Sequence, residues 1–366
     1  GWSIRPARVL RFPVCRRCPR PVMLRPSDPP DIALPAGPFP GLPDLPEGVG
    51  APRRVGIEIE FGAMAPDFAA RLATRRLGGT MRALSAAEWR IEGSAIGEVK
   101  VYLDTALRPT GDEWAAEAGV AVARQVVPIE IVTEPLPQDA LPRLERLCRA
   151  LRLAGAEGSR RHVVHGYGLH LNVALADPDR GGDLPRIARA FALLEPWLRA
   201  RDPLDLSRRV LPFTQPFPDA FVDAVAGLDP GAAPDALFGL IDAHIASRNH
   251  GLDLLPAYAF LAPDRFAGHR GASGAVSARP AYHYRMPESR VDEPAWSLSY
   301  EWRRWWLVER VAAEDALTGR LSRAWTEARA GLLTDRAGYL EAVTAALGPL
   351  AALAPRDGPA PARSDA

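Results

Sequence analysis

The stretch VGIEIEF, residues 55–61, decides the fold. Apolar and acidic residues alternate in it, which is the period-two pattern of a β-strand with two different faces. Glu58 and Glu60 therefore lie on one face, and Ile57, Ile59 and Phe61 lie on the other. Neighbouring carboxylates repel each other unless a cation or a shared proton neutralises them, and their oxygens suit Mg²⁺ or Mn²⁺. A solvated strand face would show the same pattern, so later segments have to separate the two interpretations.

The bulk composition indicates a globular protein with a sizeable core. The chain has 366 residues, 47% of them hydrophobic, and a formal net charge of +1. This near-neutral charge gives no reason to expect a nucleic acid or an anionic membrane as partner. No apolar run approaches about 18 residues, and no secretory signal pattern opens the chain. We therefore expect no membrane span and a cytoplasmic protein. Lys100 is the only lysine, so any lysine-dependent chemistry must use it.

Proline content separates a leader from a folded body. Residues 1–52 hold 13 of the 37 prolines and few periodic apolar runs, which predicts an extended or disordered leader. Met23 is a candidate natural start within it. Cys15 and Cys18 have the spacing of a zinc-ligand pair, but a closed site needs a second pair. We expect one catalytic domain over residues 53–354 and a disordered tail over residues 355–366.

Hydrophobic periodicity predicts strands and helices in alternation along the body. Beyond the first strand, strands are expected over residues 97–104, 126–132, 167–175 and 283–286. Helices are expected over residues 66–77, 141–151, 184–199, 219–226 and 236–247, and from residue 296 onwards.

Three further features are open to more than one interpretation. Cys148 lies on the apolar stripe of an expected helix, which favours a core residue over a reactive thiol. The tryptophan-rich segment 302–306 predicts a core helix, with a subunit interface as the alternative. Residues 268–280, rich in glycine, serine and alanine, predict a loop that is either a plain connection or a lid over a ligand.

A second acidic strand follows at residues 129–134, IEIVTE. Alternation places Glu130 and Glu134 on one face. A charged residue in an otherwise apolar strand is costly unless it is paired or bound. Glu130 is therefore a candidate metal ligand, and an ion pair with an arginine is the alternative.

Histidine and asparagine share one face of a third strand, residues 168–173, GLHLNV. His170 and Asn172 alternate there with apolar residues, as Glu58 and Glu60 do in the first strand. Imidazole and carboxamide groups suit a metal ion or a phosphate oxygen. A zinc site formed by His162, His165 and His170 is a further alternative.

Arginines mark the last expected strand and the turn after it, residues 283–290, HYRMPESR. Arg285 and Arg290 offer planar donor groups that match phosphate or carboxylate oxygens, with surface ion pairs as the alternative. The sequence has no P-loop, no G-x-G-x-x-G turn, no G-x-S-x-G elbow and no H-E-x-x-H helix. A nucleotide would therefore have to bind to a different architecture, such as a sheet face with carboxylates, a histidine and arginines.

Four motifs in this order resemble the amidoligase family, which is grouped with glutamine synthetase and glutamate–cysteine ligase in a carboxylate–amine ligase superfamily. The resemblance covers about residues 53–309. The motifs are GIEIEF at 56–61, EIVTEPL at 130–136, GLHLN at 168–172 and YRMPESR at 284–290.

The resemblance implies an α+β fold in which a curved antiparallel sheet carries the active site on one face and helices pack on the other. It also implies ATP and two or more Mg²⁺ or Mn²⁺ ions. The implied metal ligands are Glu58, Glu60, Glu130 and His170. The implied nucleotide contacts are His170, Asn172, Arg285 and Arg290, and the candidate catalytic residues are Arg285, Glu60 and Lys100.

This chain departs from the family pattern at two positions. His283 stands where relatives often have an acid two residues before the arginine, which reduces the metal count or supplies a nitrogen ligand. Glu134 stands where many relatives have proline, so its role is open. Glu60 and Glu134 are both candidates to accept the amine proton.

The expected reaction is ATP-dependent formation of an amide or isopeptide bond through an acyl phosphate. The partners would be a small-molecule or peptide carboxylate and an amine. A non-catalytic nucleotide- or peptide-binding protein of the same fold and a zinc-dependent hydrolase are the alternatives. The sequence identifies neither substrate, nor the oligomeric state.

Overall fold

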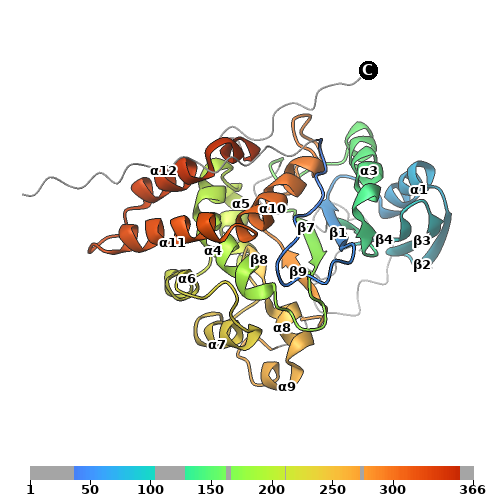
Figure 1. Ribbon diagram of the computed structural model, residues 1–366. Coiled ribbons are helices and arrows are strands. Elements are labelled where there is room, and N and C mark those ends of the chain that lie inside the picture. Colours follow the sequence, from blue (N-terminus) through green and yellow to red (C-terminus); the bar gives the residue numbers. More distant parts are fainter. Residues whose placement is uncertain (1–36, 104–127, 162–165, 211, 273–275, 355–366) are drawn as a thin grey trace, which may run out of the picture.

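One large antiparallel sheet organises the molecule. The computed structural model describes residues 37–103, 128–161, 166–210, 212–272 and 276–354. Nine strands in this part form an open sheet in the order β2-β3-β4-β5-β1-β7-β9-β8, and β6 pairs with the start of β1 (Figure 1). The strands are β1 (Arg54–Phe61), β2 (Thr80–Ser85), β3 (Glu88–Ser94), β4 (Gly97–Leu103), β5 (Ile129–Thr133), β6 (Leu136–Pro137), β7 (Leu169–Ala174), β8 (Leu252–Asp253) and β9 (Ala281–Tyr284).

Helices surround this sheet and supply most of the remaining chain. The α-helices are α1 (Pro66–Leu77), α3 (Leu141–Leu153), α4 (Leu184–Arg201), α5 (Leu206–Val210), α6 (Asp219–Ala226), α7 (Pro234–His244), α8 (Leu255–Leu261), α9 (Pro263–Phe266), α10 (Leu298–Ala312), α11 (Asp315–Arg329) and α12 (Arg336–Leu347). Short 3₁₀ turns are η3 (Gln138–Ala140), η4 (Pro212–Thr214) and η5 (Gly348–Leu353). Several helices have proline in the first turn, where the missing N–H costs nothing.

The two faces of the central strands differ as the alternation in β1 predicts. Ile57, Ile59 and Phe61 are fully buried, whereas Glu58 and Glu60 are partly exposed. The same division continues in β4, where Val99 and Val101 are fully buried and Lys100 between them is partly exposed. One face of the sheet is therefore part of the apolar core, and the opposite face carries polar side chains.

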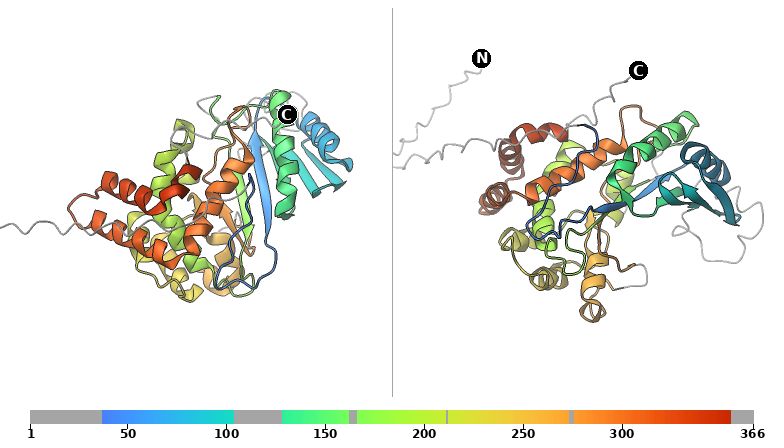
Figure 2. Two further views of the ribbon diagram at one scale, coloured as in Figure 1. Left: turned by 45° about the horizontal axis from the view of Figure 1, so that its top comes forward. Right: turned by 45° about the vertical axis from the view of Figure 1, so that its right-hand side comes forward.

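Two groups of helices cover the apolar core. Figures 1 and 2 show α4 and α10 beside the β7–β9 half of the sheet, with α11 and α12 packed against α4 further out, and α1 with α3 beside the β2–β4 half. Aromatic rings join β9 to the first group. Trp305 of α10 lies 5.5 Å from Tyr282 and 5.3 Å from Tyr284, and Phe191 of α4 lies 5.8 Å from Tyr284, between ring centroids. Because Tyr282 and Tyr284 point into the core, the residue between them points to the polar face.

The segment before β1 packs against α10. Trp302 donates its indole N–H to the Pro40 carbonyl at 2.8 Å, and Trp306 donates to Gly41 at 2.9 Å. Arg53 forms a buried ion pair with Glu309 at 2.5 Å, which ties the start of β1 to the same helix. Residues 37–52 therefore lie against the folded body. The domain boundary at residue 53 stays a prediction.

The structure confirms the α+β class with an antiparallel sheet and does not test the glutamine synthetase type of fold. Helices α1 and α6 have the expected bounds, and β1, β4, α3 and α4 lie within two residues of theirs. Cys148 and the tryptophans of α10 are buried, as expected. The hairpin of β2 and β3 was not expected. The predicted Cys15–Cys18 pair, the candidate start Met23 and the predicted tail at 355–366 lie outside the described residues.

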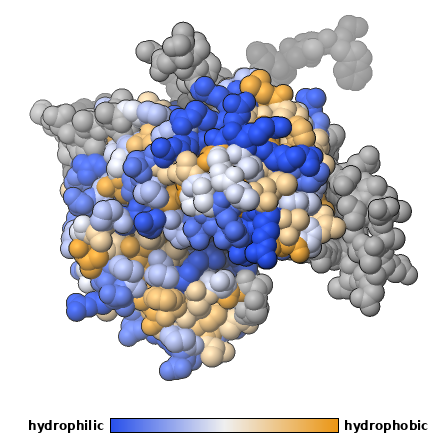
Figure 3. Space-filling view, turned by 90° about the vertical axis from the view of Figure 1, so that its right-hand side faces the viewer, coloured by the Kyte–Doolittle hydropathy of each residue, from blue (hydrophilic) through white to orange (hydrophobic). Residues whose placement is uncertain are grey.

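The exposed end of the sheet is polar. Strand β2 is exposed along almost its whole length, and hydrophilic residues cover much of the side that carries α1, β2 and β3 (Figure 3). Among the described residues, no helix has both the length and the apolar character needed to cross a membrane.

Candidate active site

Strand pairing gathers the polar residues of β1, β5, β7 and β9 on one face. Glu58 pairs with His170 of β7, and Glu60 pairs with Glu130 of β5. His283 of β9 pairs with Asn172, one step further along β7. Directly paired residues in antiparallel strands point to the same face, with Cβ atoms about 5 Å apart. The register thus brings three of the four sequence motifs to one patch.

The patch contains two overlapping sets of possible metal ligands. One consists of Glu58, His170 and His283, and the other of Glu60, Glu130 and His170. Within each set the donor atoms all lie within 4.8 Å of one another. A divalent cation with ligand distances of about 2.0–2.3 Å fits donors at this spacing. The residues present therefore fit the metal ions that the sequence led us to expect.

His170 connects the two sets through its two ring nitrogens. Its Nδ1 lies 2.7 Å from Glu58 Oε2, and its Nε2 lies 4.0 Å from Glu60 Oε1. With the proton on Nδ1, the ring donates to Glu58 and presents the Nε2 lone pair toward Glu60. Asn172 donates to the other Glu58 oxygen at 2.7 Å. Glu58 therefore holds both the histidine and the asparagine in place.

The protonation states suit cation binding. Burial alone would raise the pKa of Glu58, but the hydrogen bond from His170, the charges of His170 and His283 and the Asn172 amide together hold it well below its usual value. Burial lowers the pKa of His283 to about 4, despite its hydrogen bond to Asp253. At neutral pH the pair is thus a carboxylate and a neutral imidazole, the forms that bind metals.

His283 is held from behind by a carboxylate that no motif contains. Asp253 of β8 pairs with His283 across the sheet, and its Oδ2 lies 3.3 Å from His283 Nδ1. His283 Nε2 is buried, lies 3.8 Å from Glu58 Oε2 and has no hydrogen-bond partner among the described residues. The ring therefore directs an unused nitrogen into the patch.

Two arginines, the buried Arg208 and the partly buried Arg285, adjoin the acidic groups. Arg285 donates from Nη1 to the Arg248 carbonyl at 3.2 Å. Arg208 of α5 donates to the carbonyls of Gly166 at 3.0 Å and Arg285 at 2.7 Å. Burial lowers the pKa of both guanidinium groups, and the Glu60 charge opposes that effect in each. Neither Nε atom has a hydrogen-bond partner within the described part of the chain, so both groups retain donor capacity.

Gly168 leaves room for the side chains of His170 and Arg208. A Cβ atom at Gly168 would lie 2.6 Å from His170 Nε2 and 2.8 Å from Arg208 Nη1. The Gly168 N–H also donates to Glu60 Oε2 at 2.6 Å. The close approach shows that Arg208 and His170 are neighbours, and it explains the glycine of the third motif.

Comparison with known families identifies the family of this chain. A family model described as "Putative amidoligase enzyme" matches residues 51–307. The chain belongs to this amidoligase family. The match covers β1 to β9 and most of α10, and membership supports a ligase activity. Neither a curated protein nor a solved structure matches the chain.

Other predicted site residues of this amidoligase lie beside the patch or away from it. Lys100 of β4 pairs with Val132, which pairs with Glu58, so its backbone lies two strands, roughly 10 Å, from Glu58. Glu134 is exposed beyond the end of β5 and accepts a hydrogen bond from the Glu98 N–H at 3.2 Å. Lys100 shares the polar face, whereas Glu134 belongs to neither ligand set. His162 and His165 lie outside the described residues.

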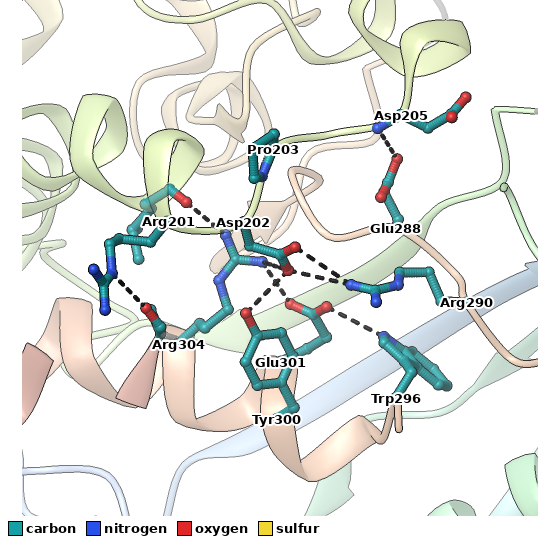
Figure 4. Close-up of polar contacts among 12 residues, drawn as sticks. Arg201, Asp202, Pro203, Asp205, Glu288, Arg290, Trp296, Tyr300, Glu301 and Arg304 are labelled. Carbon is teal, nitrogen blue, oxygen red and sulfur yellow. Dashed lines mark hydrogen bonds and ion pairs between the residues drawn. The ribbon is translucent and has the colours of Figure 1, made fainter. Parts of the chain in front are cut away.

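Arg290 lies in a separate buried network. It bonds to Glu293 at 2.5 Å and lies 3.4 Å from Asp202, which also accepts from Tyr300 at 2.9 Å. Figure 4 shows Arg290 turned toward Asp202. The Arg290 guanidinium therefore bonds to carboxylates of this network and is not brought to the ligand sets.

The candidate site includes four residues that sequence reasoning missed: Arg208, Arg248, Asp253 and Arg279. Arg248 Nε lies 3.3 Å from Asp253 Oδ2, and Arg279 donates to Asn172 Oδ1 at 2.6 Å. Asp253 lies in a two-residue strand and Arg208 in a five-residue helix. Elements this short have no measurable periodicity, so the only available signal was the residue type.

Proposed function

We propose that this protein is an ATP- and Mg²⁺- or Mn²⁺-dependent carboxylate–amine ligase that forms an amide or isopeptide bond through an acyl phosphate. The carrying observation is the pair of overlapping ligand sets on one sheet face, beside the buried Arg208 and the partly buried Arg285. The carboxylates and imidazoles suit the metal ions of a metal-bound triphosphate, and the guanidinium groups suit its phosphate oxygens. Family membership supports the same assignment.

The residues divide into cation-binding and phosphate-binding groups. Glu58, Glu60, Glu130, His170 and His283 would hold the metal ions, which supply neutralisation of phosphate charge when bound. Arg285 and Arg208 would bind phosphoryl oxygens, because both have donor capacity and lie in the electrostatic field of Glu60. Asn172 would orient Glu58 and contact the nucleotide. Lys100 of β4, the strand next to β5, is a candidate phosphate contact.

The chemistry would proceed in two steps. An oxygen of the substrate carboxylate attacks the γ-phosphorus, and the bond to the β–γ bridging oxygen breaks, so ADP leaves and an acyl phosphate forms. The amine then attacks the acyl carbon, the acyl C–O bond breaks, phosphate leaves, and a carboxylate accepts the amine proton. Arg285 would stabilise charge on the transferred phosphoryl group. Glu60, next to Gly168, is the candidate proton acceptor when it is not engaged with a cation.

Hydroxylamine provides a direct test, because it captures an acyl phosphate as a hydroxamate without knowledge of the natural amine. The protein is incubated with ATP, Mn²⁺, hydroxylamine and a panel of amino acids and dicarboxylic acids, and ADP and hydroxamate are measured. We expect both products in equal amounts for at least one acid. Glu130→Gln should abolish both, and Glu92→Gln, a change on the exposed part of β3, should abolish neither.

Two results would favour the alternatives. Binding of ATP without ADP formation across the panel would indicate a non-catalytic nucleotide-binding protein. Tightly bound zinc together with a lack of ATP binding would indicate the hydrolase. Either result contradicts the ligase proposal.

A further inference from the structure

We propose that Glu58, His170 and His283 form a nitrogen-rich metal position that selects a divalent transition-metal ion over Mg²⁺, beside an oxygen-rich position at Glu60 and Glu130. The inference rests on the metal-dependent function proposed above and refines it by assigning a different class of ion to each position. It depends on His283 and Asp253, which belong to none of the four motifs.

His283 has the features of a metal ligand. The residue is only 3% exposed, and its Nε2 has no hydrogen-bond partner among the described residues. Buried polar atoms are normally paired, so a lone nitrogen needs a physical reason. Nε2 points toward Glu58 Oε2 at 3.8 Å, too far for a hydrogen bond and suitable for an ion between the two atoms. A cation at this point would satisfy the nitrogen.

Asp253 and Arg248 prepare His283 for this role. Asp253 Oδ2 lies 3.3 Å from His283 Nδ1, and Arg248 Nε lies 3.3 Å from the same oxygen. A carboxylate behind one ring nitrogen fixes the proton there and makes the other nitrogen a better ligand, as in carboxylate–histidine–metal arrangements. Arg248 favours the charged form of Asp253. Arg248 Nη2 also lies 3.5 Å from His283 Nδ1, and the Asp253 oxygen is nearer at 3.3 Å, so Asp253 is the group that favours the proton on Nδ1.

His170 can serve only one of the two positions at a time as a neutral imidazole. If Nδ1 binds the ion between Glu58 and His283, the ring proton moves to Nε2, which lies 4.0 Å from Glu60 Oε1. The second position then keeps the carboxylates of Glu60 and Glu130 as its protein ligands. Imidazole nitrogens suit Zn²⁺, Fe²⁺ and Ni²⁺, whereas carboxylate oxygens suit Mg²⁺ and Mn²⁺. Mn²⁺ accepts nitrogen ligands more readily than Mg²⁺ does, so it can report on the nitrogen-rich position in competition with Mg²⁺. The two positions therefore differ in ligand chemistry as well as in place.

The test measures metal binding to the full chain without ATP, after removal of metals with a chelator. Pulsed EPR on bound Mn²⁺ counts coordinated imidazole nitrogens. We expect two in the unchanged protein and one in His283→Gln. The ratio of Mn²⁺ to Mg²⁺ affinity, measured by competition, should fall by about tenfold or more in His283→Glu, which keeps a ligand but replaces nitrogen by oxygen.

His269→Gln is a matched control. His269 is also buried and also has an Nε2 without a hydrogen-bond partner in the described part of the chain, but it belongs to neither ligand set. Its replacement should leave the nitrogen count and the affinity ratio unchanged. Asp253→Asn should weaken Mn²⁺ binding while both imidazoles stay coordinated, which a purely structural role would not produce. Circular dichroism verifies that each variant is folded.

Two outcomes would overturn the inference: a single coordinated imidazole in the unchanged protein, or an affinity ratio that His283→Glu leaves unaltered. Because ATP is absent, these outcomes are independent of ligase activity. Two imidazoles without hydroxamate formation would contradict only the proposed reaction. Hydroxamate formation with one imidazole would contradict only the nitrogen-rich position.

Discussion

Arg208 is the site residue with the least sequence signal and the clearest chemical role. Its guanidinium group is buried, bonds to two backbone carbonyls and lies against His170. A buried cation next to an acidic patch of candidate metal ligands is suited to a phosphoryl group, which brings negative charge into the same space.

Replacement of Arg208 should therefore slow phosphoryl transfer. We expect Arg208→Gln to lower the rate of ATP-dependent hydroxamate formation by about 10²–10³-fold, the usual effect of removing one donor that stabilises transition-state charge. Arg209→Gln is the control, because Arg209 is an exposed neighbour in the same helix. Equal rates for the two variants would exclude Arg208 from the reaction.

Gly168 should tolerate no side chain. A Cβ atom there would lie 2.6 Å from His170 Nε2, so Gly168→Ala must displace a ligand or the Arg208 side chain. We expect a loss of stability of about 1–3 kcal/mol, typical of overpacking, together with weaker Mn²⁺ binding. Thermal unfolding and metal titration measure the two effects. Gly227→Ala should change neither, because the nearest atom to its Cβ would lie 3.7 Å away.

His283 should make the metal-free protein sensitive to mild acid. Its pKa is about 4 in the folded state, against an ordinary value of 6.5. Between these values the unfolded chain binds a proton that the folded chain does not, so the free energy of unfolding falls as the pH drops from 6.5 toward 4. Denaturant titrations should show a smaller fall in His283→Gln. The same slope in both proteins would contradict the low pKa.

At the scale of elements, α5 depends on a buried carboxylate for its position. Glu288 accepts a hydrogen bond from the Asp205 N–H at 2.6 Å, directly before α5 (Figure 4). It also forms an ion pair with Arg160 at 2.8 Å. This contact attaches a five-residue helix, too short to be stable alone, to the segment after β9.

Loss of this attachment should loosen α5 and with it Arg208. In Glu288→Gln we expect faster hydrogen exchange for the amides of residues 205–209 and a lower rate of hydroxamate formation. Glu293→Gln, a change in the same segment that leaves the Asp205 contact intact, should leave exchange in α5 unchanged. Faster exchange across the whole chain would instead indicate general destabilisation.

The sequence predicts elements well where apolar residues repeat over several turns or along a full strand. β1, α1 and α6 are examples. It missed β2, which is mostly exposed and has no repeating pattern, and β3, in which the alternation is limited to Trp89 and Ile91. It also missed β8, which has two residues. The candidate ligands Glu58, Glu60, Glu130 and His170 could be found from alternation, but Asp253 becomes a neighbour of His283 only through long-range pairing.

At the scale of the whole molecule, a buried ionic network joins distant parts of the chain. Asp202 follows α4 and lies 3.4 Å from Arg290, 3.6 Å from Arg304 of α10 and 3.5 Å from Arg160. Arg304 also bonds to the buried Glu301 at 3.1 Å (Figure 4). Removal of one member leaves other buried charges without compensation.

Asp202→Asn should therefore destabilise the fold by about 3–5 kcal/mol, as expected when one partner of a buried ion pair is removed. Denaturant unfolding measures this change. Asp67→Asn, which breaks the exposed ion pair with Arg71, should cost less than about 1 kcal/mol. Equal costs for the two substitutions would show that the network adds little to stability.

The order of the ligands along the chain has a consequence for synthesis. The donors come from β1, β5, β7 and β9, and the last of them, His283, is translated more than 200 residues after Glu58. A nascent or truncated chain that ends before β9 has no complete nitrogen-rich set. Capture of a transition-metal ion should thus report that the last strand has joined the sheet. Because a ligand that binds only the native state stabilises it, the bound ion would also raise the free energy of unfolding of the complete protein.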